Sequence, residues 1–344
     1  MRVQYLSRVI VNFSPYLIGW RLRCMNEIDE ICFNIRVLLE EAVKRNICEG
    51  ILLSGGLDTS ILAVLASKFT PLTAFTVGFG LAEAPDVEYA KIVSSKLRLN
   101  HIVYYFGESE IYGAIRRVIE IVKSFDPMEI RNSAAIYIGL RVAREHGVNA
   151  VMTGDGADEL FAGYSFLFGL EKGRLDLELQ KLWSEMRFSS ILLARTLGLE
   201  AKLPFLDKNF MSFAMKIDSK YKVRSERGKI YGKWILRKAF EGILPDEIVW
   251  RDKVPIEQGS GTALLQSLFN SRISDDEFEA KKREYFEKDD VIIRDKEQMF
   301  YYEVYRSILG APRSTEASGK LCPYCKSSVN EKSTYCRTCG AYPI

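Results

Sequence analysis

The fold of this chain is decided by one stretch, Leu53-Ser54-Gly55-Gly56-Leu57-Asp58-Thr59-Ser60. It lies between an apolar run at residues 50–53, typical of a buried strand, and a helical pattern at residues 61–68. The first backbone N–H groups of a helix are unpaired, and glycines let the chain pass close to a phosphate, so a strand, a glycine turn and a helix N-terminus form an anion site. The stretch therefore predicts a phosphate-binding loop, in which the hydroxyls of Ser54, Thr59 and Ser60 add hydrogen bonds.

An acid stands in this loop where a nucleotide-binding loop of the Walker type has a lysine. The Walker pattern G-x-x-x-x-G-K-[ST] needs that lysine for the terminal phosphates, and no lysine follows here before Lys68. A carboxylate such as Asp58 beside a bound phosphate requires Mg²⁺ between them. The loop therefore predicts binding of Mg-pyrophosphate in an enzyme that forms AMP and pyrophosphate. A glycine turn without a ligand is the alternative that the loop alone leaves open.

A second segment, residues 151–164, combines glycines and acids after an apolar strand end. It reads V-M-T-G-D-G-A-D-E-L-F-A-G-Y. Its carboxylates are expected at the carboxyl edge of a parallel sheet, where open α/β folds bind ligands. Capping of a helix N-terminus would explain one acid, but not Asp155, Asp158 and Glu159 within five residues.

A third segment, residues 250–261, carries a lysine of interest. It reads W-R-D-K-V-P-I-E-Q-G-S-G and follows K-W-I-L-R-K-A-F at residues 233–240 and Leu-Pro at 244–245. Taken alone, Lys253 would be interpreted as a solvated surface residue, like most of the 48 lysines and arginines. Its position in the longer pattern makes it a candidate for the site.

Together these segments resemble the PP-loop ATP pyrophosphatases and, within them, the synthetase domain of asparagine synthetase. Residues 153–164 are similar to the family's S-G-E-G-S-D-E-x-F-x-G-Y, and residues 233–261 to K-x-x-L-R…L-P…R-x-K-x-x-x-x-x-G-x-G. Weaker matches occur at residues 75–78, 126–133 and 200–207. The resemblance runs from about Ile28 to Leu309, which is most of the chain.

The resemblance implies a role for each group at the nucleotide. ATP would lie on residues 53–60, where Asp58 shares Mg²⁺ and pyrophosphate with Asp158. Thr153 and Gly154 would contact the nucleotide. Val77, at the end of the second strand, would contact adenine, although a plain core strand explains this residue equally well.

The resemblance also implies the chemistry. Lys253 would stabilise the negative charge that builds on the phosphate as a carboxylate attacks it. The catalytic set is then Lys253, Asp155, Asp58 and Asp158. Asp155 replaces the family's glutamate with a side chain one methylene shorter, at the position that handles the nitrogen nucleophile. Lys202 replaces an arginine and loses its bidentate fork. Both differences from the family pattern bear on which carboxylate substrate accepts the nitrogen.

Short apolar runs alternate with helical patterns, for example at residues 73–79, 87–97 and 102–106. This rhythm predicts an α/β fold, a parallel sheet with helices on both faces, of the adenine nucleotide alpha hydrolase-like (PP-loop) type. Helical segments and a small zinc ribbon are expected to follow. The expected organisation is an extension at 1–27, a synthetase-like domain at 28–310, a linker at 311–320 and the ribbon at 321–344.

Composition excludes some classes of partner. The chain has 344 residues, 47% of them hydrophobic, and 48 basic against 45 acidic residues. A net charge of +3 gives no reason to expect a nucleic-acid or membrane surface overall. The apolar run at residues 9–18 is interrupted by Asn12, Ser14 and Pro15, so it predicts neither a membrane span nor a signal peptide. We expect a cytoplasmic protein.

The N-terminus bears on the source of nitrogen. Glutamine-using asparagine synthetases begin with a catalytic cysteine directly after the initiator, whereas this chain begins Met1-Arg2-Val3. We therefore expect no glutaminase domain. Nitrogen would come from free ammonia, from a separate glutaminase chain or from an amine already on the substrate.

The C-terminal cysteines predict a metal site. Two C-x-x-C pairs, separated by ten residues, supply four thiolates for tetrahedral Zn²⁺. They are Cys322, Cys325, Cys336 and Cys339. So small a segment needs the metal to fold, and four cysteines leave no open position for chemistry. The ribbon is expected to be structural, with a surface for the main domain, another protein or RNA.

Three functions are compatible with these residues. The first is an asparagine synthetase-like ligase that adenylates a carboxylate, by default aspartate, and then transfers nitrogen to it. The second adenylates a macromolecule such as tRNA or a protein, recruited by the ribbon. The third is a non-catalytic ATP-binding scaffold, which would need neither the second acid nor Lys253.

Overall fold

The computed structural model describes residues 26–313 and 319–344. The N-terminal extension expected at residues 1–27, with the apolar run at 9–18, lies outside the described residues up to residue 25. The same holds for residues 314–318 of the expected linker.

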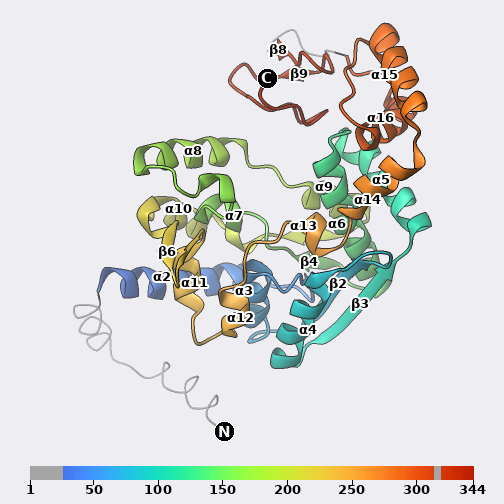
Figure 1. Cartoon of the computed structure of the whole chain (residues 1–344). Coiled ribbons are helices and arrows are strands. Elements are labelled where there is room, and N and C mark those ends of the chain that lie inside the picture. Colours follow the sequence, from blue (N-terminus) through green and yellow to red (C-terminus); the bar gives the residue numbers. More distant parts are fainter. Residues whose placement is uncertain (1–25, 314–318) are drawn as a thin grey trace.

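A five-stranded parallel sheet forms the centre of the molecule (Figure 1). Its strands are β1 (Gly50–Leu52), β2 (Thr73–Phe79), β3 (Asn100–Phe106), β4 (Ala150–Met152) and β5 (Glu200–Lys202). Their spatial order is β3-β2-β1-β4-β5. The predicted succession of a strand, a helix and a strand at residues 73–106 is confirmed as β2, α4 (Pro85–Leu97) and β3.

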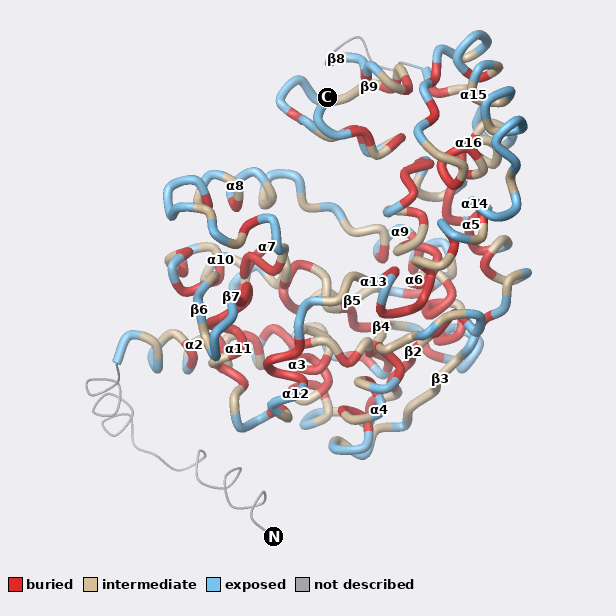
Figure 2. Tube along the Cα trace, in the orientation of Figure 1, coloured by how far each residue is buried: buried red, intermediate tan, exposed pale blue. Residues whose placement is uncertain are grey.

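Both faces of the sheet are covered, because successive side chains of a strand point to opposite faces. Ile51 of β1 and Ala74 of β2 belong to a core that includes α2 (Glu27–Arg45), α3 (Leu57–Ala66) and α4. Phe75 and Val151 belong to the opposite core, with α5 (Glu108–Val122), α6 (Pro127–Glu145) and α9 (Ser189–Thr196). Figure 2 shows buried segments gathered at the sheet and its adjoining helices. The predicted fold class is confirmed.

The strand order reverses between β1 and β4. The chain proceeds from β1 to β2 and β3 on one side, then returns to place β4 and β5 on the other. Open α/β sheets bind ligands outside the carboxyl ends of the strands at such a reversal. Both glycine-and-acid segments follow these two strands, residues 53–60 after β1 and residues 153–159 after β4.

Short helices and two small antiparallel hairpins complete the fold. Between β4 and β5 lie α7 (Ala157–Phe161), η1 (Ser165–Leu167), α8 (Lys172–Glu185) and α9. After β5 come η2 (Pro204–Leu206), α10 (Lys208–Lys216), η3 (Ser219–Tyr221), β6 (Arg224–Glu226), β7 (Lys229–Tyr231) and α11 (Trp234–Phe240). Then follow α12 (Asp246–Val249), α13 (Ile256–Gly259), α14 (Leu264–Arg272), α15 (Asp275–Asp289), α16 (Lys296–Leu309), β8 (Lys320–Leu321) and β9 (Ser328–Val329).

The cysteine-rich C-terminus packs against the main body. Its four cysteines and Ala341 belong to the same buried cluster as Phe125, Tyr302 and Tyr305. Figure 1 shows β8 and β9 beside α15 and α16. Across residues 26–313 and 319–344, no helix combines the length and the apolar character needed to cross a membrane.

Candidate active site

The loop after β1 has the geometry of an anion site. Leu53 N–H donates to Phe75 O at 2.9 Å, which holds the loop to the neighbouring strand. The hydroxyls of Ser54 and Thr59 are 3.1 Å apart, and Gly56 N–H donates to Ser54 Oγ at 3.3 Å. Gly55 has φ +65°, and a Cβ there would lie 2.3 Å from the backbone carbon of Tyr89, so only glycine fits. No side chain caps the N-terminus of α3, so its first N–H groups are available to a ligand.

The loop after β4 lies against the first loop. A Cβ on Gly154 would be 3.1 Å from Asp58 Cβ and 3.2 Å from Thr59 Cγ2. Thr153 N–H donates to Lys202 O at 3.0 Å, which fixes this loop to β5. The structure therefore brings the two predicted nucleotide-binding segments into contact.

Asp155 is held by two hydroxyl groups. Thr153 Oγ1 donates to Asp155 Oδ2 at 2.8 Å, and Ser190 Oγ of α9 donates to the same oxygen. Burial raises the pKa of the Asp155 carboxyl, an effect that the two hydroxyl hydrogen bonds oppose and that the nearby carboxylates of Asp158 and Asp58 increase. Asp155 therefore releases its proton less readily than an ordinary aspartate.

Lys233 lies between the two predicted magnesium ligands. Its ammonium Nζ is 2.5 Å from Asp58 Oδ2 and 2.7 Å from Asp158 Oδ1, and its side chain is only 4% exposed. The residue has φ +56° at the start of α11, and its N–H donates to Phe161 O at 2.9 Å. One buried cation therefore joins the loops after β1 and β4.

Lys253 reaches the same acid from a third segment. Its Nζ is 2.7 Å from Asp158 Oδ2, and its side chain is 35% exposed. Burial alone would lower the pKa of Lys253, but the carboxylates of Asp158 and Asp58 outweigh it and raise that pKa to about 12. For Asp158, burial alone would raise the pKa, but the ammonium groups of Lys233 and Lys253 lower it below its ordinary value. The Asp158 carboxylate and the Lys253 ammonium are therefore both charged at neutral pH.

Arg237 connects α11 to the segment that carries Lys253. Its guanidinium donates to Gly232 O at 3.0 Å, to Val249 O at 2.5 Å and to Arg251 O at 2.9 Å. It therefore ties the residue before Lys233 to the segment that leads to Lys253.

Arg251 joins the Lys253 segment to the phosphate loop. Its guanidinium donates to Ser54 O at 3.2 Å and to Asp86 Oδ1 at 2.7 Å, and it lies 3.8 Å from the ring centroid of Tyr89. Burial raises the pKa of the Asp86 carboxyl, and Arg251 opposes that shift. Three distant segments are thus fixed around one guanidinium.

The carboxylates fit a magnesium ion. Within the described part of the chain, Asp58 Oδ1 is buried and has no hydrogen-bond partner. Carboxylate oxygens are the protein ligands that Mg²⁺ prefers, usually one or two of them together with substrate phosphates. Asp58 and Asp158 therefore suit the ion that the resemblance implies.

Gly163 has no room for a side chain at this site. A Cβ there would lie 1.8 Å from Asp158 Oδ1 and 2.4 Å from Lys233 Cε. We expect Gly163→Ala to displace both groups and to lower catalytic turnover at this site by at least about 100-fold, since displacements near 1 Å have this effect. Gly173→Ala in α8, where a Cβ meets open space, is the matched control and should leave turnover unchanged. Equal turnover in the two variants would contradict this geometry.

The remaining predicted residues lie near the same edge of the sheet. Val77 is on β2, half-buried, with its Cγ1 3.7 Å from where a Cβ on Gly139 of α6 would be. Lys202 is on β5, and its ammonium pairs with Glu200 Oε1 at 2.6 Å. Its charge is therefore balanced on its own strand.

The four C-terminal cysteines form a cluster suited to a metal ion. Their Sγ atoms all lie within 4.8 Å of one another and are buried. The pairs Cys322/Cys339 and Cys325/Cys336 have sulfur separations of 3.7 and 3.6 Å. Four thiolates at about 2.3 Å from a tetrahedral ion would lie about 3.8 Å apart, which matches these separations.

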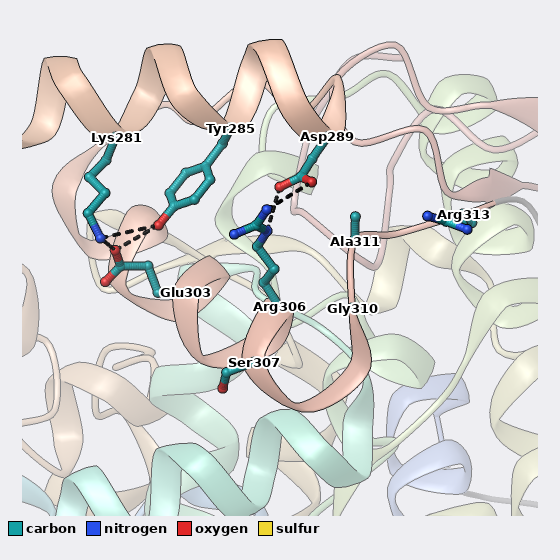
Figure 3. Close-up of a pocket in the computed structure, with 9 residues that line it drawn as sticks. All are labelled: Lys281, Tyr285, Asp289, Glu303, Arg306, Ser307, Gly310, Ala311 and Arg313. Atoms are coloured by element: carbon teal, nitrogen blue, oxygen red, sulfur yellow. Dashed lines mark hydrogen bonds and ion pairs between the residues drawn. The ribbon is translucent and has the colours of Figure 1, made fainter.

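A separate pocket of about 600 Å³ lies between α15 and α16 (Figure 3). Its charged groups pair with one another, Arg306 with Asp289 at 2.7 Å and Lys281 with Glu303. None of its lining residues belongs to the site of Asp58 and Asp158. Because these charged side chains neutralise one another, the pocket indicates no particular ligand.

Sequence reasoning gave no role to Lys233, Ser190 or Arg251. Lys233 and Arg251 stand in the quoted motifs, so the pattern contained a signal for them. Ser190 lies outside every motif, and only its contact with Asp155 identifies it.

Comparisons with known proteins agree with the geometry. A family model described as asparagine synthase matches residues 34–197 and 191–319. A probable asparagine synthetase (glutamine-hydrolyzing) of Schizosaccharomyces pombe is 32% identical over 313 residues, which cover 80% of this chain and 55% of that protein. Asparagine synthetase B (glutamine-hydrolyzing) of Escherichia coli is 29% identical over 309 residues, covering 82% and 54%. The chain spans about half the length of the curated relatives it matches.

Solved structures also match this chain. The NMN synthetase from Francisella tularensis is 18% identical and has a TM-score of 0.29, with 57% of this chain and 80% of that chain covered.

Proposed function

This chain belongs to the asparagine synthase family, and from that premise we propose that it is an ATP-dependent amide-forming ligase. It adenylates a carboxylate with release of pyrophosphate, then transfers nitrogen to the acyl group with release of AMP. The observation that carries the proposal is the meeting of Asp58, Asp158, Lys233 and Lys253 at the carboxyl ends of β1 and β4.

The nucleotide binds at the loop after β1. The open N-terminus of α3 and the hydroxyls of Ser54 and Thr59 bind phosphate oxygens. Asp58 and Asp158 would hold Mg²⁺, which when bound would supply positive charge at the pyrophosphate leaving group. The ammonium of Lys233, between Asp58 and Asp158, would add positive charge beside the same pyrophosphate.

Lys253 acts in the adenylation step. A carboxylate oxygen of the acceptor attacks the α-phosphorus, and the bond to the pyrophosphate oxygen breaks. Because its pKa is raised to about 12, Lys253 is protonated at neutral pH. Its partly exposed ammonium can leave Asp158 and neutralise the charge that develops on the α-phosphate.

Asp155 acts in the nitrogen-transfer step. The nitrogen nucleophile, ammonia or nitrogen delivered by a partner glutaminase, attacks the acyl carbon, and AMP leaves. The nucleophile must lose a proton as the amide forms, and a carboxylate with a raised pKa is a stronger base for accepting it than an ordinary one. Ser190 and Thr153 orient Asp155 for this role.

The test is to measure AMP, pyrophosphate and asparagine in one sample of purified protein with Mg-ATP and ammonium, with and without aspartate. Equal amounts of all three products, dependent on aspartate, would support a synthetase that uses this acceptor. AMP formation at the same rate with and without aspartate would rule out aspartate as the acceptor but would still support adenylation of another substrate. Absence of nucleotide turnover with every carboxylate tried, and with a glutaminase added, would reject the ligase.

For the cysteine cluster we propose Zn²⁺ as the structural metal. We expect one zinc ion per chain by atomic emission spectrometry. Cys325→Ser should lower that content to well under half, because a structural site loses geometry with any one of its thiolates. Cys48→Ser, which alters a buried thiol outside the cluster, is the control. Full zinc content in Cys325→Ser would contradict this assignment.

A further inference from the structure

The C-terminal knuckle of the ribbon, residues 335–340, is attached to the main body largely through its backbone carbonyl groups. Phe125 N–H donates to Thr338 O, and Ser124 Oγ to Arg337 O, both at 2.7 Å. Gln298 Nε2 donates to Cys339 O at 2.7 Å, and Arg294 Nη1 to Gly340 O at 3.0 Å. Gln298 is fully buried, so its bond to Cys339 O is shielded from water.

The orientation of these carbonyls depends on the cysteine cluster. They lie in the turn between Cys336 and Cys339, which is closed by a hydrogen bond from Gly340 N–H to Cys336 O at 2.7 Å. Both thiols of the turn point into the four-sulfur cluster. A metal that fixes the thiolates therefore also fixes the groups that contact the main body.

The knuckle holds the first turn of α6. Tyr335 OH donates to Asp126 Oδ2, while Asp126 Oδ1 accepts the N–H of Met128 at 3.2 Å and caps the helix. A Cβ on Gly340 would lie 2.2 Å from Asp126 Oδ1, so the turn packs directly on this cap.

The first turns of α6 contact the segment that follows Lys253. Asn132 Oδ1 accepts the N–H of Glu257 at 3.0 Å, and Arg131 O accepts the hydroxyl of Thr262 at 3.2 Å. These contacts fix the position of α13, which begins three residues after Lys253.

The same turns also contact the start of α9, next to the residue that supports Asp155. Ser133 Oγ donates to Ser189 Oγ at 2.8 Å, and the next residue, Ser190, holds Asp155. A second connection runs from the ribbon itself, because Arg337 Nη2 donates to the O atom of Glu185 at 2.5 Å, and Glu185 is the last residue of α8, four positions before α9. Both sides of the site are therefore linked to the knuckle.

We propose that Tyr335 and Arg337 of the metal-bound knuckle are positioning residues of the ligase site: they hold α6 and the segment before α9, and through these the Lys253 segment and Asp155. The proposal rests on the proposed function for its catalytic consequence. Its structural consequence, tighter backbone at those two segments, stands without it. The ribbon then serves this chain's own site and is not a detachable module for recruiting a macromolecule.

The first experiment measures hydrogen–deuterium exchange of the full-length protein, zinc-loaded and after treatment with a chelator. We expect metal removal to raise exchange in residues 320–344 and also in residues 126–133, 185–190 and 254–262, with residues 50–79 unchanged. A rise confined to residues 320–344, or one spread evenly over the chain, would overturn the proposal. The result is independent of turnover, so it stays informative if the proposed reaction fails.

The second experiment uses variants that retain the metal. In the double variant Tyr335→Phe/Arg337→Ala, we expect one zinc per chain, unchanged ATP binding, raised exchange at residues 126–133 and 185–190, and turnover lowered about tenfold. Lys332→Ala, at an exposed ribbon position, is the matched control and should resemble the unmodified protein. Unchanged exchange in the double variant would overturn the proposal, whereas raised exchange in a protein without ligase activity would reject only the proposed function.

Discussion

Replacing Lys253 with alanine should lower the rate of AMP and pyrophosphate formation by about 100- to 1000-fold, the usual cost of removing a group that stabilises developing negative charge. The ammonium of Lys253 contacts Asp158 at 2.7 Å and stays charged at neutral pH. ATP should still bind, because the phosphate loop, Asp58 and Lys233 are intact. The measurement is a single-turnover assay of AMP formation alongside equilibrium binding of ATP.

Lys229→Ala is the control for this substitution. Lys229 is exposed and pairs with Asp252, the neighbour of Lys253, at 3.0 Å. The Lys229→Ala substitution removes a positive charge from the same region without affecting Asp158. Turnover should therefore stay within about twofold of that of the unmodified protein, as expected for an exposed ion pair. Full activity of Lys253→Ala, or an equal loss in both variants, would reject the role of Lys253.

Replacing Lys233 with methionine should destabilise the nucleotide-free protein by about 3–5 kcal/mol, the range measured when one partner of a buried ion pair is removed. Methionine keeps most of the side-chain volume, so the loss reports the charge. Asp58 and Asp158 would then repel each other with only the partly exposed Lys253 to compensate. The free energy of unfolding in urea, with and without Mg²⁺, is the measurement. Mg²⁺ should restore part of the loss, because it offers both carboxylates a new counter-charge.

Lys238→Met, on the same helix, serves as the comparison for Lys233→Met. Lys238 is partly exposed and pairs with Glu241 at 2.6 Å, so its removal should cost no more than about 1 kcal/mol. If the two variants unfold at the same urea concentration, Lys233 does not carry the charge balance of the site.

Much of the fold could be predicted because its signals are local. The glycine loop at residues 53–60 requires a strand before it and a helix after it, and the structure has β1 and α3 there. The alternation of strands and helices likewise gave the parallel sheet with helices on both faces, since apolar runs and helical periodicity are properties of neighbouring residues. The family resemblance was carried by such local motifs and is confirmed by the family model.

The candidate site was predicted in part. Asp58, Asp158 and Lys253 stand in recognisable motifs, and the structure brings them to one place. The clearest addition is Lys233, which is separated from Asp58 by 175 positions. The two acids and the lysine come from three separate segments of the chain. The pattern of residues within any one segment therefore cannot predict that they meet.

The sequence by itself determined the phosphate loop, the α/β class, the family and the four-cysteine cluster, because each depends on residue types at short spacings along the chain. Only the tertiary structure decided that Lys233 bridges the two acids, that Ser190 holds Asp155 and that the ribbon rests on the cap of α6. These contacts depend on which segments meet when the two cores pack. Those at the ribbon are made largely to backbone carbonyls, which every residue possesses and which therefore leave no signature in the sequence.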